Sequence, residues 1–153
     1  MAYTLSKAQT GSQTLFQINT GTTTTPIWTP IYEITEISQS GKSNATADTT
    51  NLQSLATEWL PTLTSEGEFD ISANRVSNDP GQIAVLASFN AKTIIMYEIQ
   101  LPKTLTQTVS GDLYAFSAGV VEYEDLSSLS PTKQIMVKAK IKVSGPVVVT
   151  AGT

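Results

Sequence analysis

The sequence contains no histidine and no cysteine. Zinc sites of the usual ligand sets, cysteine nucleophiles and histidine-based acid–base pairs are therefore excluded. No disulfide can form, so packing or assembly must stabilise the fold. Charged residues are also scarce, at 14% of the chain against about 25% in an average protein. The 9 basic and 13 acidic residues give a net charge of −4, which argues against a protein that binds nucleic acid by neutralising phosphates.

Long hydrophobic runs are missing as well. The longest, such as residues 83–87 and 146–149, are too short to cross a membrane, and residues 1–7 lack the apolar core of an export signal. We therefore expect no membrane association and no cleaved signal peptide. Hydroxyl groups are abundant instead, because 39 of the 153 residues are serine or threonine. The surface is thus expected to be polar mainly through hydroxyls and amides.

The chain divides into two parts by composition. Residues 1–26 are small and threonine-rich, and they end in four threonines before Pro26. This composition predicts a flexible N-terminal arm, within which residues 14–18 could form a short strand. Residues 27–150 are predicted to form a single β domain, because apolar and polar residues alternate along several segments. The predicted strands are residues 27–38, 67–74, 93–101, 113–124, 133–144 and 145–150.

One helix is predicted between these strands. Asn78 or Asp79 provides an N-cap and Pro80 the first helical position, so the helix should cover residues 80–90. Ile83, Leu86 and Ala87 are spaced to form its apolar stripe. The sum is a mainly β fold, namely a β-sandwich or partial barrel of six to eight strands with one flanking α-helix and a long inserted loop.

The inserted loop covers residues 39–66. Connections longer than about 12–15 residues are uncommon and are usually functional or disordered. Leu52, Leu55 and Trp59 argue against disorder, and their spacing fits a short helical turn ended by Pro61. For Trp59, burial against another subunit and burial in its own domain are about equally favoured.

Charged residues at alternate positions are weighed next. Glu66, Glu68 and Asp70 are spaced as on the solvated face of a strand, which is a more common arrangement than an acid–base pair. Gly41-Lys42-Ser43 lacks the upstream glycine of a phosphate-binding loop. Alternating lysines are typical of an edge strand that resists wrong pairing, and here they are Lys138, Lys140 and Lys142. We therefore expect no catalytic residues, no metal and no cofactor.

Several segments occur in a distinctive order. Residues 48–50 read Asp-Thr-Thr and residues 58–61 read Glu-Trp-Leu-Pro, and a strand, a helix and a hairpin follow. The chain then closes with alternating lysines and Ser-Gly-Pro at residues 144–146. Over residues 27–149 this order resembles the major tail tube protein of tailed bacteriophages, most closely the long non-contractile-tail type. One departure is Thr62, where the family usually has a glycine.

The resemblance implies a structural virion protein and no enzyme. In that family, subunits form hexameric rings that stack into the tail tube, the conduit for DNA ejection into the host. The implied partners are further copies of the chain, a tape-measure protein, and tail terminator and tip proteins. DNA would pass through the lumen without specific binding. The implied location is the virion tail, after assembly in the host cytoplasm. The alternative is the tube protein of a bacterial contractile injection or type VI secretion system.

Two groups of residues are candidates for these roles. Because DNA must slide, the tube wall should not hold phosphates, and acidic side chains on strands near the loop suit such a wall. The lumen-facing candidates are Glu36, Glu68, Asp70 and Glu98. The candidates for contacts between subunits lie in the inserted loop and are Asp48, Leu52, Leu55, Trp59, Leu60 and Pro61. Less favoured functions are a carbohydrate-binding β-sandwich and a two-carboxylate hydrolase.

Overall fold

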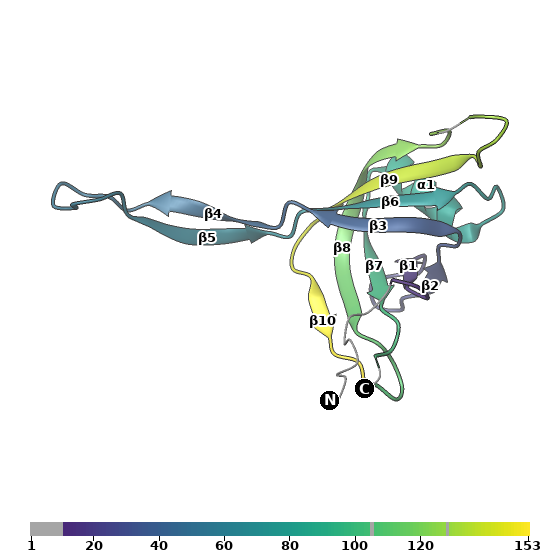
Figure 1. Cartoon of the computed structure of the whole chain (residues 1–153), viewed down its shortest axis with the longest axis horizontal. Coiled ribbons are helices and arrows are strands. Elements are labelled where there is room, and N and C mark those ends of the chain that lie inside the picture. Colours follow the sequence, from purple (N-terminus) through teal and green to yellow (C-terminus); the bar gives the residue numbers. More distant parts are fainter. Residues whose placement is uncertain (1–10, 105, 128) are drawn as a thin grey trace, which may run out of the picture.

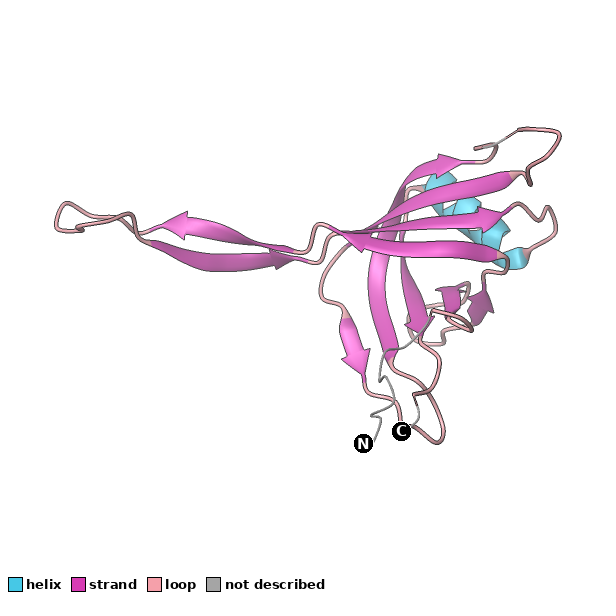
Figure 2. Cartoon of the chain, viewed as in Figure 1, coloured by secondary structure: helices cyan, strands magenta, loops and turns pink. Residues whose placement is uncertain are grey.

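The computed structural model describes residues 11–104, 106–127 and 129–153. Figures 1 and 2 show a β-rich body with one helix on its flank and a two-stranded arm that projects far from it. The mainly β fold with a single helix is therefore confirmed. The elements within these ranges are β1 (Leu15–Asn19), β2 (Trp28–Pro30), β3 (Ile34–Ser40), β4 (Ser43–Asp48), β5 (Trp59–Ser65), β6 (Glu68–Asn74), α1 (Pro80–Ala91), β7 (Ile94–Gln100), β8 (Leu113–Glu124), β9 (Met136–Val143) and β10 (Val148–Thr150).

The body is built on one bent antiparallel sheet. Its strand order is β2-β1-β7-β8-β9-β6-β3, and β10 pairs with β8. The long strand β8 pairs with β7 over residues 113–119 and with β9 over residues 118–124. A register shift between Val120 and Glu122 interrupts the second pairing, and such bulges bend a strand. β8 thus belongs to two layers, and in Figure 1 β3, β6 and β9 cross β7 and β8 steeply.

The core lies between these layers. Tyr97 on β7 is fully buried and stacks on Phe16 of β1 at 5.7 Å and on Phe116 of β8 at 5.9 Å between ring centroids. Phe116 in turn stacks on Phe69 of β6 at 4.7 Å. Alternation along β6 is as predicted, because Phe69, Ile71 and Ala73 are all buried. A chain of stacked aromatic rings therefore ties four strands together across the core.

The helix starts where the sequence predicts. Asp79 is the N-cap, because its carboxylate accepts a hydrogen bond of 2.9 Å from the backbone N–H of Gln82. The predicted apolar stripe is wrong, however, since Ile83 is 54% exposed and Ala87 is exposed. The buried face consists of Gly81, Gln82, Val85 and Ser88.

Hydrogen bonds explain why a polar residue is buried on this helix. The Gln82 side-chain amide donates to the carbonyls of Asn74 at 2.8 Å and Tyr32 at 3.3 Å, and its oxygen accepts from Val76 N–H at 3.1 Å. Gly81 lets the helix approach β2 closely, because a Cβ there would clash with the carbonyl of Pro30. The start of the helix therefore packs against the body through Gly81, which is small, and through Gln82, whose polar atoms are hydrogen-bonded.

Two predicted boundaries need correction. The short strand predicted at residues 14–18 is β1, but it belongs to the main sheet, with Phe16 and Ile18 buried, and not to a flexible arm 1–26. The threonine-rich segment after it is a turn closed by Asn19, whose side-chain oxygen accepts from the N–H groups of Gly21 at 2.8 Å and Ile27 at 2.9 Å. Residues 1–10 of that arm lie outside the described residues.

The strand predicted for residues 27–38 is two strands, β2 and β3. They are separated at residues 31–33, where Glu33 has a positive φ of 59°. A left-handed residue breaks a strand. No helix among the described residues is long and apolar enough to span a membrane.

Candidate assembly site

The inserted loop is a β-hairpin that forms an arm. β4 and β5 pair only with each other among the described residues, and every residue of both strands is exposed. The predicted helical turn ended by Pro61 is therefore wrong. Pro61 lies within β5 opposite Thr46, beside a register shift between Asn44 and Thr46. Proline fits there because an outer edge and a bulge need no ladder hydrogen bond from it.

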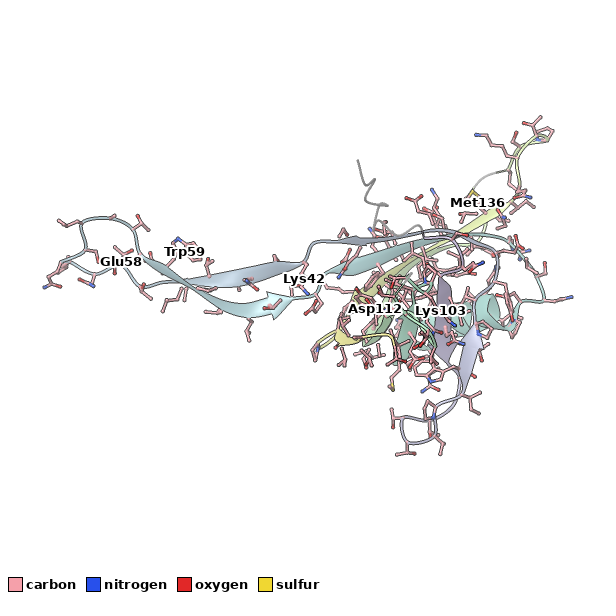
Figure 3. All side chains as sticks on the ribbon, turned by 60° about the horizontal axis from the view of Figure 1, so that its bottom comes forward. Lys42, Glu58, Trp59, Lys103, Asp112 and Met136 are labelled. Carbon is pink, nitrogen blue, oxygen red and sulfur yellow. The ribbon has the colours of Figure 1, made fainter. Side chains whose placement is uncertain are left out.

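The tip of the arm is held by threonine and aspartate side chains. The Asp48 carboxylate accepts from Thr50 N–H at 2.8 Å, and Thr50 Oγ1 accepts from Glu58 N–H at 2.9 Å. The hydrogen bonds to Thr50 lower the pKa of Asp48 below its ordinary value. Beyond these bonds, Leu52 and Leu55 are fully exposed. In Figure 3, Glu58 lies close to this tip.

The arm presents apolar side chains to solvent. Trp59, Leu60 and Leu63 are 61%, 59% and 82% exposed. Side chains alternate along a strand, so Trp59 and Pro61 share one face of β5 and Leu60 lies on the other. The register shift sets residues 62 and 63 of β5 against Ala45 alone, so alternation does not assign Leu63 to a face. Leu63 was not among the sequence candidates, and its spacing from Pro61 could not have assigned it to their face because the bulge of β5 lies there. Contiguous exposed apolar surface marks an interaction site, and an isolated hairpin is at best marginally stable.

The arm joins the body at two short connections, which are tied to each other. Lys42 Nζ lies 2.7 Å from Glu66 Oε2, and the Glu66 side chain is only 14% exposed. The side-chain amide of Gln39 donates to the Glu66 carbonyl at 3.1 Å. Lys42 therefore lies at the base of the arm, as Figure 3 shows. These contacts hold the two connections together at the base of the arm.

The second candidate surface is the outward side of β3, β6, β9 and the end of β8, which we call the charged face. Directly paired residues of neighbouring strands share a face, so the register defines its members. They are Glu36 on β3, Glu68 and Asp70 on β6, Lys138, Lys140 and Lys142 on β9, and Glu122 and Glu124 on β8.

The three lysines lie between two columns of acids. Lys142 is opposite Glu68, with a separation of 4.0 Å between the charged atoms. Lys140 is opposite both Asp70 and Glu122, and its Nζ lies 3.4 Å from Glu122 Oε2. The hydrogen bond and charge of Glu122 raise the pKa of Lys140. The interpretation of these lysines as an edge-strand device is wrong, because β9 is paired on both sides.

The structure separates the four acidic lumen candidates. Glu36, Glu68 and Asp70 lie together on the paired strands β3 and β6. Glu98 lies on β7, three strands away from β6, opposite Gln17 and Ala115. Partial burial raises the pKa of Glu98. Glu98 therefore belongs to the other layer of the body.

The layer that carries the charged face ends in two free edges. Among the described residues, β3 pairs with β6 alone, and residues 120–124 of β8 pair with β9 alone. The three pairings across this layer are all antiparallel, so β3 and β8 run in opposite directions. A second copy placed beside the first could therefore continue the same antiparallel pattern.

An open cleft of about 790 Å³ lies between β3 and the segment that leads into β1. Its walls include Ile34, Ile37, Phe69 and Tyr114, and Glu36 is the one acidic residue that borders it. Two-carboxylate chemistry needs a second acid close by, so this cleft does not provide it. No group of three or more acidic residues in the described ranges could hold a metal ion.

No protein-family model matches this sequence, and no curated protein sequence matches it. Solved structures do match. A chain of the sheath/tube terminator of an extracellular contractile injection system, PVC, aligns with a TM-score of 0.70 and 9% identity, covering 97% of this chain and 100% of that chain. This chain therefore shares its fold with a chain of that assembly.

Two further structures support the same fold. A chain from the tail of an empty gene transfer agent particle, with C6 symmetry, aligns with a TM-score of 0.69 and 15% identity over 94% of this chain and 100% of that chain. A chain from the six-fold symmetrised anti-feeding prophage baseplate aligns with a TM-score of 0.69 and 10% identity. The alignment covers 96% of this chain and 98% of that chain. These structures come from an extracellular contractile injection system, a gene transfer agent and the anti-feeding prophage, so they do not single out the non-contractile tail type.

Proposed function

We propose that this protein is a tube subunit whose copies form hexameric rings that stack into the hollow tube of a phage-like tail. The observation that carries this proposal is an exposed apolar arm together with two free antiparallel edges on a body that shares its fold with a chain of a sheath/tube terminator. A six-fold ring is favoured because two of the matching structures carry six-fold symmetry.

The ring closes through the layer that carries the charged face. β3 of one copy pairs with the end of β8 in the next, so that six copies with four strands each form a closed barrel without edges. At about 4.8 Å per strand and a tilt of about 40°, twenty-four strands give a backbone diameter of roughly 48 Å. Inward side chains remove about 10 Å of this. A DNA duplex, whose two grooves are each about 8 Å deep, is on the order of 20 Å across and then fits inside with water around it.

In this ring the charged face lines the lumen and the arm packs on a neighbouring copy. Glu36, Glu68 and Asp70 are then part of the wall, where acids keep phosphates from binding. DNA is ejected through the tube without specific binding, and no cofactor or catalysis is required. The assigned partners are further copies, a tape-measure protein, and tail terminator and tip proteins. The protein assembles in the host cytoplasm and resides in the virion tail.

Assembly is tested first with the arm. The purified protein at high concentration should form tubes in negative-stain electron micrographs. A variant that lacks residues 44–60 should stay folded but elute as a monomer, because it has lost Leu52, Leu55, Trp59 and Leu60 from the arm. A wild-type protein that stays monomeric in every buffer would refute the proposal, and so would normal tubes from the deletion variant.

Ring closure is tested by cross-linking. Because the chain has no native cysteine, only the introduced cysteines can react. Ser38→Cys on β3 and Glu122→Cys on β8 are combined in one chain and treated with a short bis-maleimide, which tolerates a small offset in register. The expected product is a ladder of covalent species up to the hexamer. The matched control combines Ser38→Cys with Ile83→Cys on the exposed side of α1, and it should give no ladder beyond dimers.

The role of the acidic wall is tested in assembled particles. Glu68→Lys combined with Asp70→Lys adds positive charge to the charged face and should slow DNA transit in an ejection assay. Unchanged transit in tubes of normal appearance would show that β6 does not face the lumen.

A second candidate is the tube protein of a bacterial contractile injection or type VI secretion system. It is favoured by the matches to an extracellular contractile injection system and to the anti-feeding prophage. Genes that flank the coding sequence separate the two candidates. Tape-measure and tail-terminator genes with head and packaging genes favour a phage tail, whereas secretion-system genes favour the injection device.

A further inference from the structure

The charged face has an arrangement that a purely acidic wall does not require. The lysine column of Lys138, Lys140 and Lys142 occupies its centre, on the strand that pairs with both β6 and β8. Each lysine has at least one acid directly opposite on a neighbouring strand. The opposing residues are Glu124 for Lys138, Asp70 and Glu122 for Lys140, and Glu68 for Lys142.

Two of these lysines form ion pairs with acids on the neighbouring strands. Lys140 Nζ is 3.4 Å from Glu122, and Lys142 Nζ is 4.0 Å from Glu68. Three alternate lysines on one strand repeat every 6–7 Å or so, which is about twice the 3.4 Å of helix axis that each phosphate of one DNA strand occupies. Without their acid partners, these lysines would form a regular track for a polyanion.

We propose that Glu68 and Glu122 mask the lysine column, so that the charged face does not bind a polyanion although three lysines run along its centre. The lysines in turn offset the repulsion among the acids, which a ring of copies would bring together. The inference about DNA transit rests on the proposed function, whereas the masking itself is a property of the single chain. The acids thus act as positioning and shielding residues for the lysines.

The test measures binding of a fluorescent DNA duplex to the full chain by anisotropy at low salt. Glu68→Gln combined with Glu122→Gln removes the two observed ion-pair partners and keeps the size of the side chains. We expect binding at least tenfold tighter than that of the wild type. The logarithm of the binding constant should fall with the logarithm of salt concentration with a slope of about −1.8, since two freed lysines each contribute about 0.9.

A matched control separates masking from net charge. Glu33→Gln combined with Glu58→Gln changes the net charge by the same amount at positions that are not opposite any lysine of the column, and should leave binding at the wild-type level. Adding Lys140→Gln and Lys142→Gln to the first variant should abolish the gained binding. Equal binding by both acid-to-amide variants would overturn the proposal, and so would a folded Glu68→Gln, Glu122→Gln variant that binds no better than wild type.

The outcome is independent of tube formation. If the wild-type protein never forms tubes, the proposed function fails while the binding comparison remains valid on the monomer. If tubes form normally and the unmasked variant gains no DNA affinity, the proposed function stands and masking is refuted.

Discussion

Gly41 and Gly67 face each other at the point where the arm leaves the body, and both have a left-handed backbone with φ of 75° and 80°. The two positions differ in the space around them. A Cβ on Gly41 would meet only the Cα of Gly67, at 3.9 Å, whereas a Cβ on Gly67 would clash with the carbonyl oxygen of Ser40. This joint therefore depends on glycine for two separate reasons.

The first prediction uses this difference. Gly41→Ala should cost about 1–2 kcal/mol of folding free energy, the usual penalty of the left-handed region for a residue with a Cβ. Gly67→Ala should cost clearly more, because the clash with Ser40 adds to the same backbone penalty. Urea unfolding of the two variants beside the wild type measures both. Equal losses would show that the backbone at the joint relaxes freely.

The second prediction concerns Trp59 on the arm. Trp59→Ala should leave stability within about 0.5 kcal/mol, because the side chain is exposed in the single chain. It should nevertheless prevent tube formation, which sedimentation and electron microscopy would detect. Ile83→Ala on α1 is the matched control, since Ile83 has similar exposure, and it should assemble normally.

Fluorescence gives an independent reading of the same residue. Trp28 is the only other tryptophan, so Trp28→Phe leaves Trp59 as the single reporter. Its emission should shift to shorter wavelength when tubes form, because packing on a neighbour removes it from water. An unchanged spectrum in assembled tubes would place Trp59 outside the contacts between copies.

Particular residues show how far the sequence predicted this structure. Phe69, Ile71 and Ala73 alternate with polar residues on a strand buried on one side, so β6 was predicted correctly. The arm has no buried side, and a register shift near Ala45 interrupts its period. The spacing of Leu52, Leu55 and Trp59 then resembled a helix.

Other features depend on contacts that no local pattern records. Gln82 is buried because the carbonyls of Tyr32 and Asn74 and the N–H of Val76 lie around its amide. Lysines alternate with apolar residues along β9, a pattern that is typical of an edge strand. β9 is nevertheless an interior strand, and its lysines are tolerated because one side of this layer faces solvent. Glu98 lies on the polar face of a predicted strand, as the other acidic candidates do. Only the order of strands in the sheet shows that it belongs to another layer.

The third prediction concerns the start of α1. Asp79→Ala should destabilise the protein by about 1–2 kcal/mol, since the Gln82 N–H loses its cap. Asp79→Asn keeps an accepting oxygen and should cost less. Asn78→Ala should stay within about 0.5 kcal/mol of wild type, because Asp79 and not Asn78 is the cap. Thermal unfolding followed by circular dichroism measures all three variants.

The last prediction concerns alkaline pH and the core. Burial raises the pKa of Tyr97 from its ordinary value of 10 to about 12. The unfolded chain therefore loses this proton at lower pH than the folded protein does. The contribution of Tyr97 is fully present below pH 10 and is lost as the pH rises through 12. Because one pKa unit corresponds to about 1.4 kcal/mol, the loss should approach about 2–3 kcal/mol.

Replacement of Tyr97 tests this pH dependence directly. Tyr97→Phe keeps the ring between Phe16 and Phe116 and removes the ionisable group. Urea midpoints at pH 8 and pH 11.5 should differ much less for this variant than for the wild type. Tyr32→Phe is the control, because Tyr32 is 57% exposed, and it should retain the wild-type difference. If both variants behave like wild type, the alkaline loss arises from groups other than the buried tyrosine.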